Sequence, residues 1–167
     1  MANRYAPHLL VLPEDDANRQ VANGFASDHF VTNSIQVLPP VGGWGEVLRR
    51  FRLDLVPDMA RYRDRFVVLL MDFDHRKYRL EHAKKEIPED LCDRVFVLGA
   101  WTEPEDLKRE LRSDYEGIGL ALARDCREGT KTTWGHELLR HNEAELARLR
   151  QRILPILFPS ANPAQPT

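Results

Sequence analysis

The sequence predicts an α/β fold in which a mainly parallel, four-stranded, Rossmann-like sheet carries helices on both faces and is followed by C-terminal helices. Two observations support this prediction. Short apolar runs, typical of buried strands, alternate with segments whose apolar residues recur every three to four positions, as in helices. Right-handed connections between parallel strands place such helices on both faces of the sheet. The predicted strands are residues 8–12, 34–38, 66–71 and 94–99.

The third predicted strand is the strongest of the four. Residues 66–71 are six consecutive apolar residues, and Asp72-Phe73-Asp74 follows directly. A continuous apolar run indicates a strand that is buried on both faces. The first strand, residues 8–12, is also apolar, ends at Pro13 and is followed by Glu14. Both strands are therefore expected to end in acidic residues.

Helical segments follow each predicted strand. Asp15 or Asp16 is expected to N-cap the first helix, which runs to about residue 28. Thr102 is expected to N-cap a later helix, with Glu105 at its third position as in a capping box. The other helical segments are predicted at residues 44–55, 76–86 and 115–126, and in a long final helix from about residue 134.

The sequence of the C-terminal part predicts a helical extension that follows the α/β domain. In the final helix, residues recur at intervals of seven positions, as Leu139, Leu146 and Ile153 do, which indicates a narrow packing seam. This seam is expected to pack on the α/β domain, on a second copy or on a protein partner. We therefore predict an α/β domain over residues 1–126, a helical extension over 127–158 and a disordered tail over 159–167. The seam residues are Leu139, Leu146, Leu149 and Ile153.

Composition excludes several classes of protein. The 167 residues include 24 basic and 26 acidic side chains, with a net charge of −2, so no general attraction to nucleic acid is expected. No aromatic stacking platform or basic stripe is visible. Cys92 and Cys126 lie far apart without metal-ligand spacing, which indicates free thiols in a reducing compartment. No apolar run is long enough to span a membrane, so we expect a soluble, cytoplasmic protein without a membrane partner.

Three acidic residues are candidates for one site. Ligands of parallel α/β sheets bind beyond the carboxyl ends of the strands, where Glu14, Asp72 and Asp74 are expected. Asp72 and Asp74 are predicted to point to the same side of an extended chain and to share a divalent cation. The alternative is that Asp74 caps a helix beginning near His75 while Asp72 only ends the strand.

At these residues the sequence resembles the Toprim domain of topoisomerases, bacterial primases, small RNA-maturation nucleases and overcoming-lysogenization-defect nucleases. That family has a Glu after its first strand and Asp-x-Asp after its third, matched here by Glu14 and by Asp72-Phe73-Asp74. The resemblance covers residues 8–112. It implies chemistry on nucleic-acid phosphodiesters that depends on Mg²⁺ or Mn²⁺, with both aspartates as principal ligands and Glu14 as ligand or acid/base.

The resemblance also suggests secondary candidates. The family Glu is commonly followed by Gly, whereas Asp15 follows Glu14 here and becomes a possible substitute ligand. Nuclease-type members use further carboxylates and a basic residue. The candidates for these roles are Glu103, Glu105 and Lys131.

The sequence thus leaves three functions open. The first is a metal-dependent nuclease, a hydrolase of phosphodiester bonds in DNA or RNA. The second is a non-catalytic Toprim-like module that regulates or docks a partner, or a second copy, through its C-terminal helix. The third is a phosphoacceptor receiver domain, because acidic residues follow both the first and the third strand.

Overall fold

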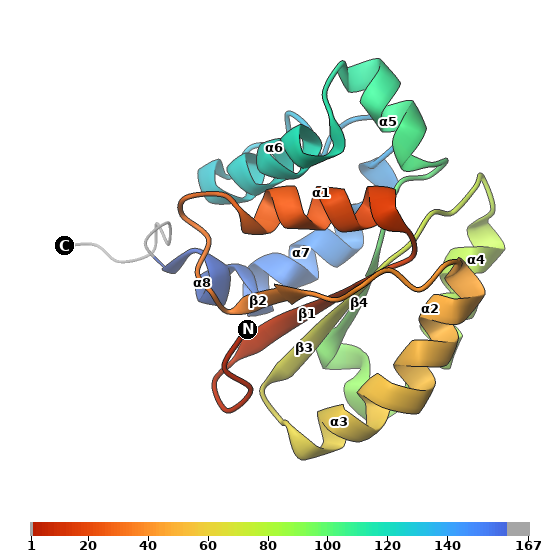
Figure 1. Cartoon of the computed structure of the whole chain (residues 1–167), viewed down its shortest axis with the longest axis vertical. Helices are drawn as coiled ribbons and strands as arrows, with labels where there is room; N and C mark the ends of the chain where they lie inside the picture. Colours follow the sequence, from red (N-terminus) through yellow and green to blue (C-terminus); the bar gives the residue numbers. More distant parts are fainter. Residues whose placement is uncertain (1, 160–167) are drawn as a thin grey trace.

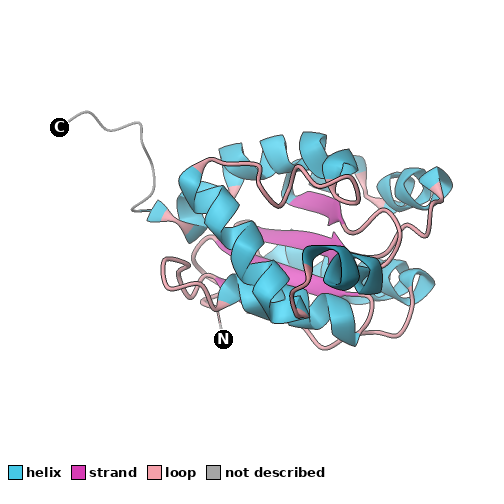
Figure 2. Cartoon of the chain, turned by 90° about the horizontal axis from the view of Figure 1, so that it is seen from above, coloured by secondary structure: helices cyan, strands magenta, loops and turns pink. Residues whose placement is uncertain are grey.

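The computed structural model describes residues 2–159, and within them the predicted α/β architecture is confirmed (Figure 1). One sheet has the strand order β2-β1-β3-β4, and all three neighbouring pairs are parallel. The strand arrows accordingly point in one direction in Figure 2. The predicted disordered tail, residues 159–167, lies outside the described residues except for Pro159. The strands are β1 (His8–Pro13), β2 (Ile35–Val37), β3 (Arg65–Leu70) and β4 (Val95–Leu98).

Two layers of helices cover the sheet, as Figure 1 shows. One layer contains α1 (Asp16–Ala26), α5 (Pro104–Leu111), α6 (Tyr115–Glu128), α7 (Glu143–Arg152) and α8 (Leu154–Leu157). The other contains α2 (Trp44–Arg50), the π-helical η1 (Phe51–Leu55), α3 (Val56–Arg61), α4 (Lys77–Glu86) and the 3₁₀-helical η2 (Glu89–Arg94). No helix among residues 2–159 has the length and apolar character needed to cross a membrane.

Alternation along β1 explains why two layers form. Leu10 and Leu12 pack into the core beneath α2, α3 and α4, whereas Leu9 and Val11 pack into the core beneath α1, α7 and α8. Successive side chains of a strand point to opposite faces, so an unbroken apolar run must be covered on both sides. β1 lies between β2 and β3, and its burial is therefore complete.

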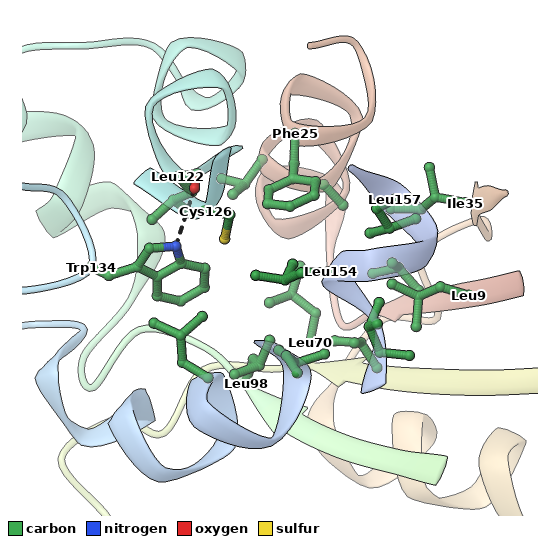
Figure 3. A pocket seen from close by; sticks show the side chains of 17 residues that line it. Leu9, Phe25, Ile35, Leu70, Leu98, Leu122, Cys126, Trp134, Leu154 and Leu157 are labelled. Atoms are coloured by element: carbon green, nitrogen blue, oxygen red, sulfur yellow. Dashed lines mark hydrogen bonds between the residues drawn. The ribbon is translucent and has the colours of Figure 1, made fainter. Parts of the chain in front are cut away.

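The core on the α1 side is apolar throughout and encloses a cavity of about 80 Å³ (Figure 3). The one polar group that Figure 3 draws with a hydrogen bond is the Trp134 indole, whose Nε1–H donates to the Leu122 carbonyl oxygen at 3.2 Å. Burial raises the pKa of the Cys126 thiol in this wall to about 12. Cys126 is therefore an unreactive packing residue.

The predicted C-terminal seam is buried, and the α/β core covers it. Each of its four residues is at most 6% exposed. The prediction of one long final helix from about residue 134 was wrong, however. A loop replaces its first part, because the Asp125 carboxylate accepts hydrogen bonds from the backbone N–H groups of Thr133 and Trp134. The helix then begins with η3 (Arg140–Asn142) and breaks at Ile153, since Pro155 cannot continue its hydrogen bonds.

Side chains from this C-terminal segment cover the free edge of β4. The Asn142 side chain accepts from the Gly99 N–H at 3.2 Å and donates to the Gly99 carbonyl at 2.9 Å. Glu145 accepts from the Val97 N–H at 2.9 Å. These bonds satisfy backbone groups that would otherwise offer a pairing edge to another chain. The segment is thus an integral part of the sheet's surroundings.

Two other helix boundaries differ from the prediction. Thr102 is not the N-cap of α5, because its carbonyl accepts the Asp74 N–H at 3.1 Å and keeps the chain extended; Glu103 takes the N-cap position. The helical segment predicted at residues 44–55 extends further, because the π-helical η1 joins α2 to α3. Pro57 lies in the first turn of α3, where its missing N–H is tolerated.

Candidate functional site

Glu14 and Asp72 lie side by side at the carboxyl edge of the sheet. Pro13 of β1 pairs with Leu70 of β3, so the residues that follow these strands leave the sheet together. The Asp72 backbone N–H donates to Glu14 Oε2 at 2.7 Å, and the Glu14 N–H donates to the Leu70 carbonyl at 2.9 Å. The parallel pairing of two strands that both end in acids therefore brings these carboxylates together.

Asn18 connects two of the acidic residues. It is buried in the first turn of α1, and its Nδ2 donates to Asp15 Oδ1 at 2.9 Å and to Asp72 Oδ1 at 3.0 Å. Asp15 also accepts the Asn18 backbone N–H, which makes it the N-cap of α1. The start of α1 thereby fixes the orientation of the Asp72 carboxylate. Sequence reasoning missed Asn18, although a first-turn position behind an acidic N-cap is a usable signal.

The α1 helix is held firmly by α6. Gly24 of α1 faces the Glu116 carbonyl, and Gly119 of α6 faces the Val21 carbonyl. A Cβ atom on either glycine would overlap these backbone atoms, so only glycine permits this close approach. The crossing fixes the position of α1 and, with it, of Asn18.

Asp74 does not join Asp72 as predicted. The prediction assumed an extended chain, but Asp74 and His75 have φ angles of 49° and 60°. Their N–H groups donate to the carbonyls of Thr102 and Trp101, which stabilise this left-handed turn. The Asp74 side chain is 55% exposed and lies 3.6 Å from Arg79 and 3.8 Å from Arg76.

Asp74 is not a helix cap either. The helix α4 begins at Lys77, its N-cap position is occupied by Arg76, and no side chain caps it. The alternative assignment of Asp74 was therefore wrong. Its paired, exposed carboxylate makes it a peripheral member of the acidic edge.

Of the secondary candidates Glu103, Glu105 and Lys131, only Glu105 acts on Asp72. Glu105 lies in the first turn of α5 and is exposed, and its charge acts on Asp72. Glu103 serves as the N-cap residue of that helix. Lys131 lies in the loop after α6, where its ammonium group contacts Glu143 of α7 at 2.8 Å. The structure thus gives Lys131 a different carboxylate partner.

Burial dominates the electrostatics of the cluster. It raises the pKa of Asp72 from 3.8 to about 8; the Asn18 hydrogen bond opposes the rise, and the charges of Glu14, Asp15 and Glu105 add to it. Burial also raises the pKa of Glu14, against the hydrogen bond from the Asp72 N–H. Asp72 therefore carries a proton at neutral pH unless a cation approaches.

Aromatic and cationic side chains border the acidic edge. The Arg79 guanidinium donates to the Asp72 carbonyl at 3.2 Å and stacks 5.3 Å from the centre of the Trp44 ring. Trp44 packs edge-to-face on Tyr78 at 6.3 Å, and Arg76 donates to the Tyr78 hydroxyl at 3.0 Å. We call Trp44, Arg76, Tyr78 and Arg79 the Trp44 cluster. The sequence did not reveal this cluster, because its residues come together from distant segments, at α2 and at the start of α4.

The donor set suits a hard cation. Glu14 and Asp72 are neighbours at this edge, and the charge of Glu14 acts on the Asp72 carboxyl group; carboxylate oxygen is the ligand type that Mg²⁺ and Mn²⁺ prefer. Within residues 2–159, no group of three or more His, Cys, Asp or Glu side chains is arranged to hold a metal ion. Mg²⁺ is commonly bound by one or two carboxylates, with water and substrate phosphate as its other ligands. Two carboxylates are therefore sufficient for such a site.

Comparison with known proteins gave no match to a family model, a curated protein or a solved structure.

Proposed function

We propose that the protein binds Mg²⁺ or Mn²⁺ through Asp72 and Glu14 and hydrolyses phosphodiester bonds in nucleic acid, as a nuclease with a Toprim-like site. The observation that carries the proposal is the state of Asp72. Its backbone N–H donates to Glu14, and its carboxyl group accepts from the same Asn18 amide as Asp15. Its pKa of about 8 reflects burial together with the charges of Glu14, Asp15 and Glu105. The charge of a bound divalent cation would offset both causes of the rise by favouring the ionised carboxylate.

The residues of the chain have separate roles in this proposal. Asp72 and Glu14 hold the cation, and Asn18 fixes the Asp72 carboxylate so that one oxygen stays oriented. Asp15 and Glu105 add negative charge around the site. When bound, the cation supplies Lewis-acid activation and neutralises charge on the phosphate.

The Trp44 cluster supports nucleic acid as the substrate class. Arg79, whose guanidinium contacts the Asp72 carbonyl, and Arg76, which lies beside Asp74, provide guanidinium groups for phosphate oxygens. Tyr78 is 49% exposed, so its ring is available to an unpaired base. Together these side chains supply the cationic and aromatic contacts that the net charge of −2 does not suggest.

The alternative is a non-catalytic module that docks a partner through the C-terminal helix. The seam of α7 is buried within the chain, so a partner or a second copy would need a different surface. This observation favours the nuclease. We also propose a cytoplasmic location, because Cys92 and Cys126 are both free thiols.

A cleavage assay tests the function. Labelled single-stranded and double-stranded DNA and RNA are incubated with the full chain in Mg²⁺, in Mn²⁺ and in EDTA. Cleavage that requires the metal and falls at least about a hundredfold in Asp72→Asn is expected. Lys131→Gln serves as the control and is expected to cleave normally. Metal-dependent cleavage that is equal in the wild type and Asp72→Asn would assign the activity to a contaminant.

A further inference from the structure

A second site lies at the opposite end of the sheet. A polar cleft of about 320 Å³ opens where β1 and β3 begin, at His8 and Arg65, which pair in register. Glu14 and Asp72 follow the other ends of these strands. A six-residue strand spans about 20 Å, so the cleft is separate from the acidic edge. Its charged and polar lining residues are Arg4, His8, Gln36, Asp58, Arg61, Tyr62 and Arg65.

Positive charge is in excess in this cleft. The guanidinium groups of Arg4, Arg61 and Arg65 lie 5.6, 5.5 and 4.7 Å from the centre of the Tyr62 ring. Asp58 is the one carboxylate among the lining residues, and it lies 3.4 Å from Arg65. Three cations therefore face one anion, which leaves two positive charges for a ligand. A cleft of this size is also within the range that holds small molecules.

The deepest of the three guanidinium groups is held in place. The Arg65 side chain is 9% exposed, and its Nε–H donates to His8 Nε2 at 3.0 Å. Because an arginine Nε can only donate, His8 Nε2 must accept, and the His8 proton must lie on Nδ1, which bonds the Ala6 carbonyl at 2.8 Å. His8 is thus a neutral positioning residue. It orients Arg65 without adding charge.

Apart from the Gln36 amide, the rest of the wall is apolar. Leu10, Leu38 and Leu55 line the cleft beside the charged residues. A ligand that fills the cleft therefore needs an anionic group for the arginines and an apolar body for the leucines. A phosphate monoester carries a charge of about −1.5 to −2 at neutral pH, which matches the excess, whereas a carboxylate carries only one charge. Guanidinium groups also fit phosphate oxygens in pairs.

We propose that this cleft binds a small phosphate monoester with an apolar body, whose phosphate contacts Arg4, Arg61 and Arg65. The site is independent of the metal proposed at Asp72. Binding therefore persists in EDTA and in the Asp72→Asn variant.

Isothermal titration of the full chain in EDTA tests this site, with phenyl phosphate, inorganic phosphate and phenyl sulfonate as probes. Phenyl phosphate is expected to bind more tightly than either of the other two. Arg61→Gln and Arg4→Gln are each expected to weaken it about tenfold, since each removes a charged donor. The matched control is Arg63→Gln: Arg63 is exposed, lies two residues from Arg61 and does not line the cleft. It removes the same charge and is expected to leave the affinity unchanged.

Three results would overturn the proposal. Equal losses in Arg61→Gln and Arg63→Gln would show general attraction to a basic surface. If phenyl sulfonate bound as tightly as phenyl phosphate, the proposed preference for a doubly charged phosphate would be wrong. If phenyl phosphate did not bind at millimolar concentration, the site itself would be rejected. Arg4 and Arg61 are exposed, and the buried hydrogen bond between Arg65 and His8 involves neither of them, so their replacement tests binding while that pair is kept. Arg4 also donates to the Tyr62 hydroxyl at 3.2 Å.

Discussion

Replacing Asp72 by Asn is expected to make the metal-free protein more stable at pH 8. The wild-type carboxyl group has its pKa raised from 3.8 to about 8 in the folded state. The folded protein therefore holds this proton more tightly than the unfolded chain. Its free energy of unfolding falls as the pH rises from about 4 to about 8 and then becomes level. Asparagine is neutral throughout, so this contribution to the slope disappears in the variant.

The size of the effect follows from the pKa. Each pKa unit is worth about 1.4 kcal/mol, so the rise from 3.8 to about 8 gives an upper limit of about 6 kcal/mol for Asp72. The carboxyl group is only partly buried and water reaches it, so we expect about 2 kcal/mol of added stability at pH 8. The Asn side-chain oxygen can still accept from Asn18, so the hydrogen bond that orients this residue is kept.

Urea denaturation in EDTA, followed by tryptophan fluorescence between pH 5 and 8, measures this difference. Asp74→Asn is the matched control, because the same substitution two residues away affects an exposed carboxylate that pairs with Arg79. It is expected to change stability by less than about 0.5 kcal/mol at either pH. The reasoning is refuted if Asp72→Asn is less stable than the wild type at pH 8, or if its slope with pH equals that of the wild type.

Three other predictions concern the fold. Asn142→Ala leaves the N–H and the carbonyl of Gly99 without their hydrogen-bond partner. In urea titrations it is expected to lower the free energy of unfolding by about 2–4 kcal/mol. A loss below about 1 kcal/mol would mean that water replaces the side chain. In the native protein, Ellman's reagent is expected to titrate Cys92, which is exposed, and not Cys126, whose thiol is buried; rapid reaction of two thiols would contradict the packing of α6. Deletion from Glu143 onward uncovers the sheet face beneath α7, so the truncated chain is expected to lose cooperative unfolding in circular dichroism. A truncated chain that folds normally would show that α7 is dispensable.

The sheet was predictable because local signals decide it. Continuous apolar runs mark the strands, and strand order along the chain limits their arrangement, so the approach of Glu14 to Asp72 follows from two short segments. The N-cap role of Asp15 is equally local. These features need no knowledge of distant contacts.

The remaining parts of the site depend on contacts between distant segments. Asp74 does not point to the same side as Asp72, because backbone hydrogen bonds to Thr102 and Trp101 stabilise a left-handed turn. The Asp-Phe-Asp sequence does not reveal this turn. Arg79 and Trp44 come from separate helices that meet only when the sheet has formed. A lysine in a loop, such as Lys131, had no constraint on its partner until α7 was placed.

Metal titration of thermal stability tests the central claim, that Asp72 and Glu14 bind a divalent cation, most directly. At pH 8, Mn²⁺ or Mg²⁺ at a concentration about a hundredfold above its dissociation constant stabilises the bound state by about 2.7 kcal/mol, which corresponds to about 5–10 °C for a chain of this size. The wild type and Asp74→Asn are expected to show this rise, and Asp72→Asn is expected to show none. An equal rise in the wild type and Asp72→Asn, or no rise in the wild type, would contradict the account.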